Sequence, residues 1–508
     1  MTTTEFPETR TATGLVRGRR EEGLAVFRGI PFAQPPVGEL RFTAPKPVEG
    51  WDGVREAFAF GPPPPQEPML PPTDAPADVP AGDDWLTINV WSPEADPAAR
   101  RPVMVWIHGG ACKFGSADDP TYDASRLARD GELVVVTFNY RVGMEGFAQL
   151  EGAPANRGLL DQVAALEWVR ENIAAFGGDP NQVTLFGESA GAATIAALMA
   201  MPRARGLFSR AIAQSVPGTF LSPELAADIA GVLAGELGLG PTVSGLAGVD
   251  PHKLAAGVAA VSTRMPQYAG RWGTLAHTPT AYAHVIDGDV LPVAPWQALA
   301  EGAAREVDLL VGHTRDEFRT FLGLGGLFGQ IGDDLAAMAL NALAPVPDAV
   351  QAYRAAYPGV SAEGLFELVH SDWLFRMPSL HLAQAHAAGG GRAHLYEITW
   401  STPVSGGALG ACHGVDLPLV FGSYSGGFGQ LLIGEPTPET EALSSRFRSI
   451  WTTFAATGDP GWPAYDAESR LTQLIDTDLT VTRYPEEASH RLWQNHTFAA
   501  LPLVADAG

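Results

Sequence analysis

Short apolar runs separated by helical stretches are the feature that most limits what this chain can fold into. Four such runs are rich in β-branched or aromatic residues and are followed by turn residues: 103–107, 134–138, 183–186 and 308–311. Between the second run and the third, residues 161–176 carry apolar side chains at helical spacing, and a Gly-Gly-Asp-Pro sequence ends this helix. Strands that alternate with helices predict an α/β fold, in which helices cover both faces of a mostly parallel sheet.

The whole chain, residues 1–508, is expected to form one domain with helical insertions around its active site. Its 508 residues, 46% of them hydrophobic, can bury a large core. The proline-dense segment 61–80 could be a linker, but strand-like patterning resumes directly after it at 83–91. We therefore interpret 61–80 as a surface loop, and the glycine-rich segment 323–329 as another.

Net charge and cysteine content limit the partners and the compartment. The formal net charge of −24 repels phosphate backbones and anionic lipids, so neither nucleic acid nor membrane is an expected partner. No apolar run approaches the ~20 residues of a membrane-spanning helix, and the N-terminal residues lack the pattern of a signal peptide. Two cysteines cannot build a disulfide framework. These features predict a cytoplasmic protein, with a monomer as the default.

The sharpest local motif is Gly187-Glu188-Ser189-Ala190-Gly191. It follows the strand-like run 183–186 and precedes a helical stretch at 192–199. A nucleophile elbow requires this strand–turn–helix context, in which flanking glycines permit the tight turn and the helix N-terminus favours a developing anion. The motif predicts Ser189 as a nucleophile.

A second motif, His108-Gly109-Gly110-Ala111, follows the run 103–107. Small residues after a strand allow backbone N–H groups to approach a substrate closely, as an oxyanion hole requires. We assign the oxyanion donors to the N–H groups of Gly110, Ala111 and Ala190.

An activated serine also needs a base and a carboxylate. Asp316 and Glu317 both follow the run 308–311, and the residues alone do not choose between them. Among twelve histidines, His413 lies in the small-residue loop Gly410-Ala-Cys-His-Gly414, which could bring an imidazole to the serine. The two acids flanking Gly288 are typical of a turn, and no metal-binding motif is present, so no metal or cofactor is expected.

In its ordered motifs the chain resembles type-B carboxylesterases, and most closely the bacterial para-nitrobenzyl-esterase-like branch of the cholinesterase family. The matching blocks are residues 29–38, 40–42, 84–89, 139–143, 158–162, 176–181, 183–191, 211–215, 285–289, 316–317, 413–418 and 462–463. The resemblance implies the α/β-hydrolase fold and a catalytic triad of Ser189, Glu317 and His413.

The same resemblance implies supporting positions and shows departures from the pattern. It implies roles beside the triad for Glu188, Ser215 and Asp416, and an ion pair between Arg41 and Asp83. Trp85 replaces the first disulfide cysteine of secreted relatives. Cys112 and Cys412 lie next to the catalytic loops, where we interpret them as small pocket-lining residues. Lys113 beside the oxyanion loop is interpreted as facing solvent.

The predicted function is hydrolysis of small to medium apolar esters through an acyl-enzyme. Neutral His413 takes the Ser189 proton, so activity should fall as the pH drops through the titration of imidazole, near ~6.5. Two alternatives stay open: an amidase or carbamate hydrolase with the same triad, and a non-catalytic binding protein of the same fold.

Overall fold

Alternating side chains on the central strands divide the core into two layers. The computed structural model describes residues 5–66 and 82–504. Along strand β7 (Arg101–Ile107), Val103 and Val105 pack into one hydrophobic cluster, whereas Met104 and Trp106 pack into the other. Successive side chains of a strand point to opposite faces, so a strand that is apolar at every position must be covered on both sides.

Eleven of the described strands form one sheet, in the order β14-β13-β12-β11-β10-β9-β7-β8-β6-β4-β3. Pairing is parallel from β13 to β8 and antiparallel at both edges. A separate sheet has the order β1-β2-β5. The strands are β1 Glu8–Thr11, β2 Gly14–Arg17, β3 Arg19–Glu21, β4 Leu24–Pro31, β5 Val54–Glu56, β6 Thr87–Ser92, β7 Arg101–Ile107, β8 Val134–Phe138, β9 Gly178–Glu188, β10 Arg210–Gln214, β11 Asp308–Thr314, β12 Ala393–Ile398, β13 Leu471–Ile475 and β14 Leu479–Arg483.

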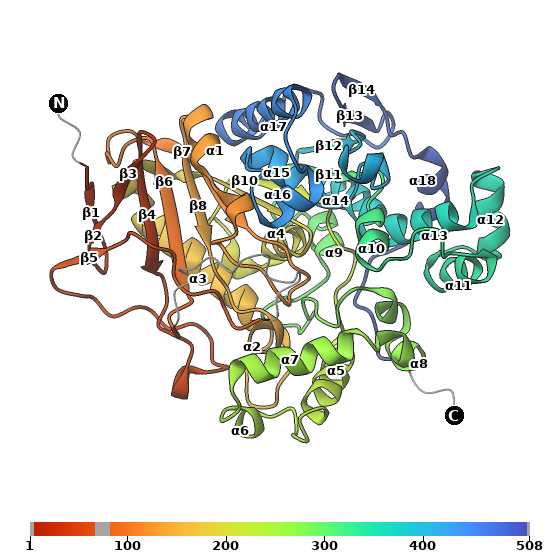
Figure 1. Cartoon of the computed structure of the whole chain (residues 1–508), viewed down its shortest axis with the longest axis horizontal. Coiled ribbons are helices and arrows are strands. Elements are labelled where there is room, and N and C mark those ends of the chain that lie inside the picture. Colours follow the sequence, from red (N-terminus) through yellow and green to blue (C-terminus); the bar gives the residue numbers. More distant parts are fainter. Residues whose placement is uncertain (1–4, 67–81, 505–508) are drawn as a thin grey trace.

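Helices cover both faces of the large sheet (Figure 1). They are α1 Ser125–Asp130, α2 Gly143–Phe147, α3 Arg157–Asn172, α4 Ala190–Ala200, α5 Pro223–Gly235, α6 Val243–Leu246, α7 Pro251–Ser262, α8 Ala269–Trp272, α9 Pro295–Ala300, α10 Arg319–Leu324, α11 Asp333–Leu343, α12 Ala349–Ala356, α13 Ala362–Ser371, α14 Met377–Ala388, α15 Asp416–Phe421, α16 Gly427–Leu432, α17 Pro438–Thr457 and α18 Glu487–Trp493. Helices α3, α4 and α14 pack in the cluster that holds Val103, and α15 and α17 pack in the cluster that holds Trp106.

The predicted α/β-hydrolase architecture is confirmed, with helical insertions α5–α8 and α10–α13 on either side of β11. All four apolar runs are strands of the parallel part of the sheet. The helix expected at 161–176 starts earlier, at Arg157, and ends in a 3₁₀ turn at Ile173–Phe176. The glycine-rich segment 323–329 begins as the last residues of α10 and continues as turns.

Two further expectations concern the proline-dense segment and membrane-spanning helices. Residues 61–66 of the proline-dense segment form neither helix nor strand, and the rest of that segment lies outside the described residues. No helix within the described ranges is long and apolar enough to cross a bilayer.

Candidate active site

Ser189 occupies the sharp turn between β9 and α4. Its φ of 55° and ψ of −122° lie outside the regions that non-glycine residues favour. Gly191 lets the helix start this close to the sheet, because a Cβ there would lie 2.1 Å from the Ile107 carbonyl oxygen. The Ser189 N–H donates to the Gln214 carbonyl at 2.9 Å and so ties the turn to β10. The turn holds Ser189 at the carboxyl edge of the parallel strands, in the wall of a pocket.

Carbonyl oxygens of the loop after β7 accept hydrogen bonds from other groups of the chain. The Gly110 carbonyl accepts the N–H groups of Lys113 and Phe114 at 3.0 and 3.1 Å, which closes a tight turn. The Ala111 carbonyl accepts the Thr280 hydroxyl at 2.9 Å. Gly110 and Ala111 both have positive φ, 102° and 55°. These bonds fix the peptide planes of the loop, while the N–H groups of Gly110 and Ala111 remain without an acceptor in the described residues.

His108 holds the first of these peptides. Its Nδ1 lies 2.9 Å from the Gly109 carbonyl oxygen, and because that oxygen can only accept, Nδ1 carries the proton. Burial lowers the pKa of His108 to about 4, so the ring is neutral. Within the described residues, no acceptor takes the N–H of Gly110, Ala111 or Ala190, and all three residues line the pocket with Ser189. The loop and the start of α4 thus present three free donors to one space.

Glu317 and His413 are brought together although 96 residues separate them. His413 Nδ1 lies 2.6 Å from Glu317 Oε2, and Glu317 Oε1 accepts the Thr314 N–H at 2.8 Å. Burial raises the pKa of Glu317, but the imidazole and neighbouring donors outweigh it and hold this pKa below its ordinary value. The adjacent Asp316 accepts the Ala411 N–H at 2.8 Å instead. Glu317 is therefore the carboxylate of this acidic pair that contacts the imidazole.

The other imidazole nitrogen faces a second carboxyl group. His413 Nε2 lies 3.0 Å from Glu188 Oε1, and His413 and Ser189 line the same pocket. Burial lowers the pKa of His413, but Glu188 and Glu317 outweigh it and raise this pKa to about 9. Burial raises the pKa of Glu188 to about 8, against the opposing effect of His413. Nε2 thus lies against Glu188, and within the described residues no hydrogen bond joins His413 to the Ser189 hydroxyl.

The resemblance also placed Asp416 and Ser215 beside the triad. Burial raises the pKa of Asp416 to about 6, and its carboxyl accepts the Gln214 side-chain amide at 2.6 Å. The Ser215 hydroxyl is one of the groups that lower the pKa of Glu317. Asp416 helps to raise the pKa of the imidazole, whereas Ser215 acts on Glu317, and neither residue lines the pocket.

Aromatic side chains form the wall beside the imidazole, and sequence reasoning missed Phe375 among them. The Phe375 ring centroid lies 4.1 Å from that of His413, and the Phe321 centroid lies 5.3 Å from it. Further apolar pocket-lining residues are Phe114, Leu324, Leu374, Leu417 and Phe428. Apolar residues at helical spacing look the same in a core as in a pocket, so no local signal marked Phe375.

The predicted ion pair between Arg41 and Asp83 is wrong. Arg41 instead pairs with Glu145 at 2.5 Å, and both side chains are buried. Its guanidinium also donates to the Ala247 carbonyl at 2.9 Å. Asp83 is exposed, and in the sequence it follows the segment 67–81, which is not described. Glu145 lies in the first turn of α2. It supplies the carboxylate because its side chain is buried next to Arg41.

The interpretations of Lys113 and Cys412 need revision. Lys113 does not face solvent freely: its ammonium donates to the Pro279 carbonyl at 3.0 Å, and burial lowers its pKa. Cys112 lines the pocket as expected, whereas Cys412 packs in the core on the far face of the sheet. Burial raises the pKa of both thiols to about 12, which keeps them protonated.

The contact between Glu188 and His413 makes a prediction about pH. Imidazolium cannot accept a proton, so activity should be lost as the pH falls through the raised pKa of His413, above the ordinary value of 6.5. Glu188→Gln removes a negative charge from Nε2, so the acidic limb of kcat/KM should move to lower pH, by about one unit or more. Profiles of kcat/KM from pH 5 to 10 measure this. Glu441→Gln, at an exposed ion pair with Arg126, is the control, and an unmoved limb in Glu188→Gln would contradict the prediction.

Comparison with known proteins identifies the family. The model of the carboxylesterase family matches residues 5–493. The para-nitrobenzyl esterase of Bacillus subtilis (strain 168) is 39% identical over 496 residues, which cover 94% of this chain and 96% of that protein. A phenmedipham hydrolase of Pseudarthrobacter oxydans is 36% identical over 484 residues, covering 92% and 95%. A carboxylesterase structure from Geobacillus stearothermophilus superposes with a TM-score of 0.84 at 35% identity, covering 96% of this chain and 100% of that one. This chain belongs to the carboxylesterase family and is a carboxylic-ester hydrolase.

Proposed function

We propose that Ser189, His413 and Glu317 hydrolyse carboxylic esters in two steps, through an acyl-enzyme. The observation that carries this proposal is the 2.6 Å contact between Glu317 and His413. His413 lines the same pocket as Ser189, which lies in a strained turn. A carboxylate on Nδ1 fixes the tautomer that leaves Nε2 free to accept a proton.

The first step transfers the acyl group to the protein. An entering ester separates Glu188 from His413 Nε2, which then takes the Ser189 proton as Oγ attacks the carbonyl carbon. The Nδ1–H bond to Glu317 stabilises the imidazolium that forms. His413 next donates this proton to the alcohol oxygen as the C–O bond breaks. In the second step water attacks the acyl-enzyme, with His413 again taking and then returning a proton, and the acid is released.

The three free backbone donors receive the negative charge of the tetrahedral intermediate. Gly110, Ala111 and Ala190 line the pocket with Ser189, and their N–H groups have no acceptor within the described residues. Each oxyanion donor contributes about 3 kcal/mol in a buried site. The positive end of α4 adds to this potential. Fixed donors of this kind need no rearrangement as the charge develops.

The substrate class follows from the pocket walls. Phe321, Leu324, Phe375 and Phe428 offer an apolar surface, which favours small to medium apolar esters over charged ones. A relative is named for the hydrolysis of phenmedipham. Initial rates on para-nitrophenyl esters of increasing acyl length map the size limit.

Covalent labelling tests the proposed nucleophile directly. A fluorophosphonate probe should phosphonylate Ser189 and stop turnover of para-nitrophenyl butyrate in proportion to the label, because only an activated serine displaces fluoride. Peptide mass spectrometry locates the adduct. Label on another residue, or turnover that survives complete labelling of Ser189, would contradict the proposal and favour a binding protein. Rates on the matched butyranilide measure the amidase alternative.

The remaining proposals concern the state of the protein in the cell. We propose one catalytic domain, in line with the single family model that spans residues 5–493, and a monomer in the cytoplasm. Two free, buried thiols support a reducing compartment. Size-exclusion chromatography with light scattering tests the monomer.

A further inference from the structure

A π-helical turn lies behind the loop that carries Glu317. Helix α13 passes through this turn, η7 (Asp372–Arg376), into α14, and Ser371 and Arg376 lie at its two ends. Both side chains are fully buried. Single π-helical turns inside α-helices are often found at functional sites. What the two side chains bind decides whether this turn has such a role.

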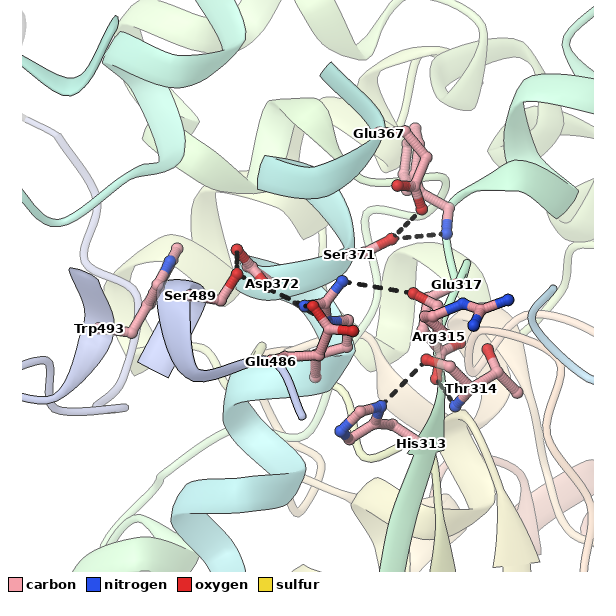
Figure 2. Close-up of polar contacts among 12 residues, drawn as sticks. His313, Thr314, Arg315, Glu317, Glu367, Ser371, Asp372, Glu486, Ser489 and Trp493 are labelled. Carbon is pink, nitrogen blue, oxygen red and sulfur yellow. Dashed lines mark hydrogen bonds and ion pairs between the residues drawn. The ribbon is translucent and has the colours of Figure 1, made fainter. Parts of the chain in front are cut away.

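Ser371 binds the peptide directly after Glu317. Its hydroxyl accepts the Phe318 N–H at 2.9 Å and donates to the carboxyl group of Glu367, so both of its hydrogen-bonding roles are used. Figure 2 shows both hydrogen bonds of the Ser371 hydroxyl as dashed lines. The His370 ring also stacks on Phe318, with centroids 4.2 Å apart. This end of η7 thus holds the chain on the C-terminal side of Glu317.

Arg376 binds the chain on the other side of Glu317. Its Nη1 donates to the Arg315 carbonyl at 3.4 Å, while Nη2 pairs with Glu486 at 2.6 Å and Nε with Asp372 at 3.3 Å. Asp372 in turn accepts the Ser489 hydroxyl at 2.6 Å. Glu486 and Ser489 belong to the start of α18, which therefore anchors the turn from the C-terminal end of the chain (Figure 2).

The opposite side of the same turn touches the imidazole. Phe375 packs against His413 with ring centroids 4.1 Å apart, and the Leu374 carbonyl accepts the Gly218 N–H at 2.9 Å. Leu374 and Phe375 both line the pocket. One short element therefore contacts the acid-bearing loop on one side and the base on the other.

We propose that Ser371 and Arg376 are positioning residues that hold Glu317 on His413, and that α18 acts through Arg376. The inference rests on the proposed roles of Ser189, His413 and Glu317. Neither residue touches the substrate pocket, so they act through the peptides at Phe318 and Arg315. Small shifts of a catalytic group, of the order of ~1 Å, lower rates by about 100-fold.

Ser371→Ala is the primary test. Losing the hydroxyl frees the Phe318 N–H and loosens the Glu317 contact, so kcat on para-nitrophenyl butyrate should fall by about 10- to 100-fold with KM unchanged. The acidic limb of kcat/KM should also move to lower pH, because the Glu317 carboxylate helps to raise the pKa of His413. The other carboxyl groups that face His413, those of Glu188 and Asp416, are unchanged in this variant.

Matched variants separate positioning from stability. Ser92→Ala removes another buried hydroxyl, which donates to the Phe176 carbonyl at 2.7 Å, so it should lower the unfolding temperature without moving kcat or the acidic limb. Ser371→Thr keeps a hydroxyl and should recover most of kcat. If Ser371→Ala does not accumulate folded, Arg376→Lys carries the same test, because lysine keeps the charge between Asp372 and Glu486 but loses the fork that also reaches Arg315.

The outcomes are distinguishable. A folded Ser371→Ala or Arg376→Lys with a lowered unfolding temperature but wild-type kcat and acidic limb would overturn the positioning role. Wild-type protein that is not labelled by the fluorophosphonate would instead overturn the proposed function. Wild-type labelling combined with a lowered kcat and a shifted limb in the variants supports both.

Discussion

Ser189→Ala is expected to lower kcat for para-nitrophenyl butyrate by about 10⁶-fold, to the level left by binding and the oxyanion donors. Alanine removes the attacking oxygen, so no acyl-enzyme can form at this position. Within the described residues the Ser189 hydroxyl makes no hydrogen bond, and alanine can adopt the same backbone as serine. Steady-state kinetics and the unfolding temperature together measure the effect, and the unfolding temperature should stay close to wild type.

A serine elsewhere provides the control for this variant. Ser222 caps α5 by accepting the Leu225 N–H at 3.2 Å and lies outside the pocket. Ser222→Ala should cost about 1 kcal/mol of stability through the lost cap and leave kcat unchanged. Retention of more than about one hundredth of kcat in Ser189→Ala would remove Ser189 from the nucleophile's role, since triad serines contribute far more than this.

The sheet could be predicted from the sequence because its signal is local. The runs that became β7, β8, β9 and β11 are apolar at nearly every position, which is what a parallel strand buried on both faces requires. The Ser189 elbow and the Gly110 loop are local as well, since small residues directly after a strand mark the places where backbone must approach closely. Their positions therefore needed no knowledge of the rest of the chain.

Contacts between distant segments could not be predicted in the same way. Composition left Asp316 and Glu317 equivalent, and only the approach of the 410–413 loop gives Asp316 the Ala411 N–H and Glu317 the imidazole. The partner of Arg41 depended on which acidic side chain is buried next to it: Glu145 is buried there, whereas Asp83 is exposed. The partly buried state of Lys113 depended on the Pro279 carbonyl, which is 166 residues away.

The π-helical turn is the clearest case of a feature without a sequence signal. Residues 362–388 form α13, the turn η7 and α14 in direct succession. The shift becomes visible only as a change of partners: Phe375 faces His413, while Arg376 faces Glu486. Tertiary packing selected this register, and it gives the acid and the base a common support.

Glu317→Gln is expected to lower kcat by about 10⁴-fold at neutral pH, although it only replaces one carboxylate oxygen with an amide nitrogen. Glu317 Oε1 accepts the Thr314 N–H at 2.8 Å, so the amide oxygen of glutamine must occupy that position. Its NH₂ group then faces His413 Nδ1, which must accept, and the imidazole proton moves to Nε2. A protonated Nε2 has no lone pair for the Ser189 proton, so the base is present in the wrong tautomer.

The neighbouring carboxylate is the matched control for that substitution. Asp316→Asn changes the same charge one residue away, where the side chain accepts the Ala411 N–H at 2.8 Å and does not contact the imidazole. Its kcat should fall by less than about tenfold, because one loop contact is weakened while the tautomer of His413 is kept. Steady-state kinetics of the two variants, with unfolding temperatures measured to exclude a loss of folding, decide between Asp316 and Glu317, which composition alone did not distinguish. A larger loss in Asp316→Asn than in Glu317→Gln would show that the carboxylate touching His413 is not the one on which proton transfer depends.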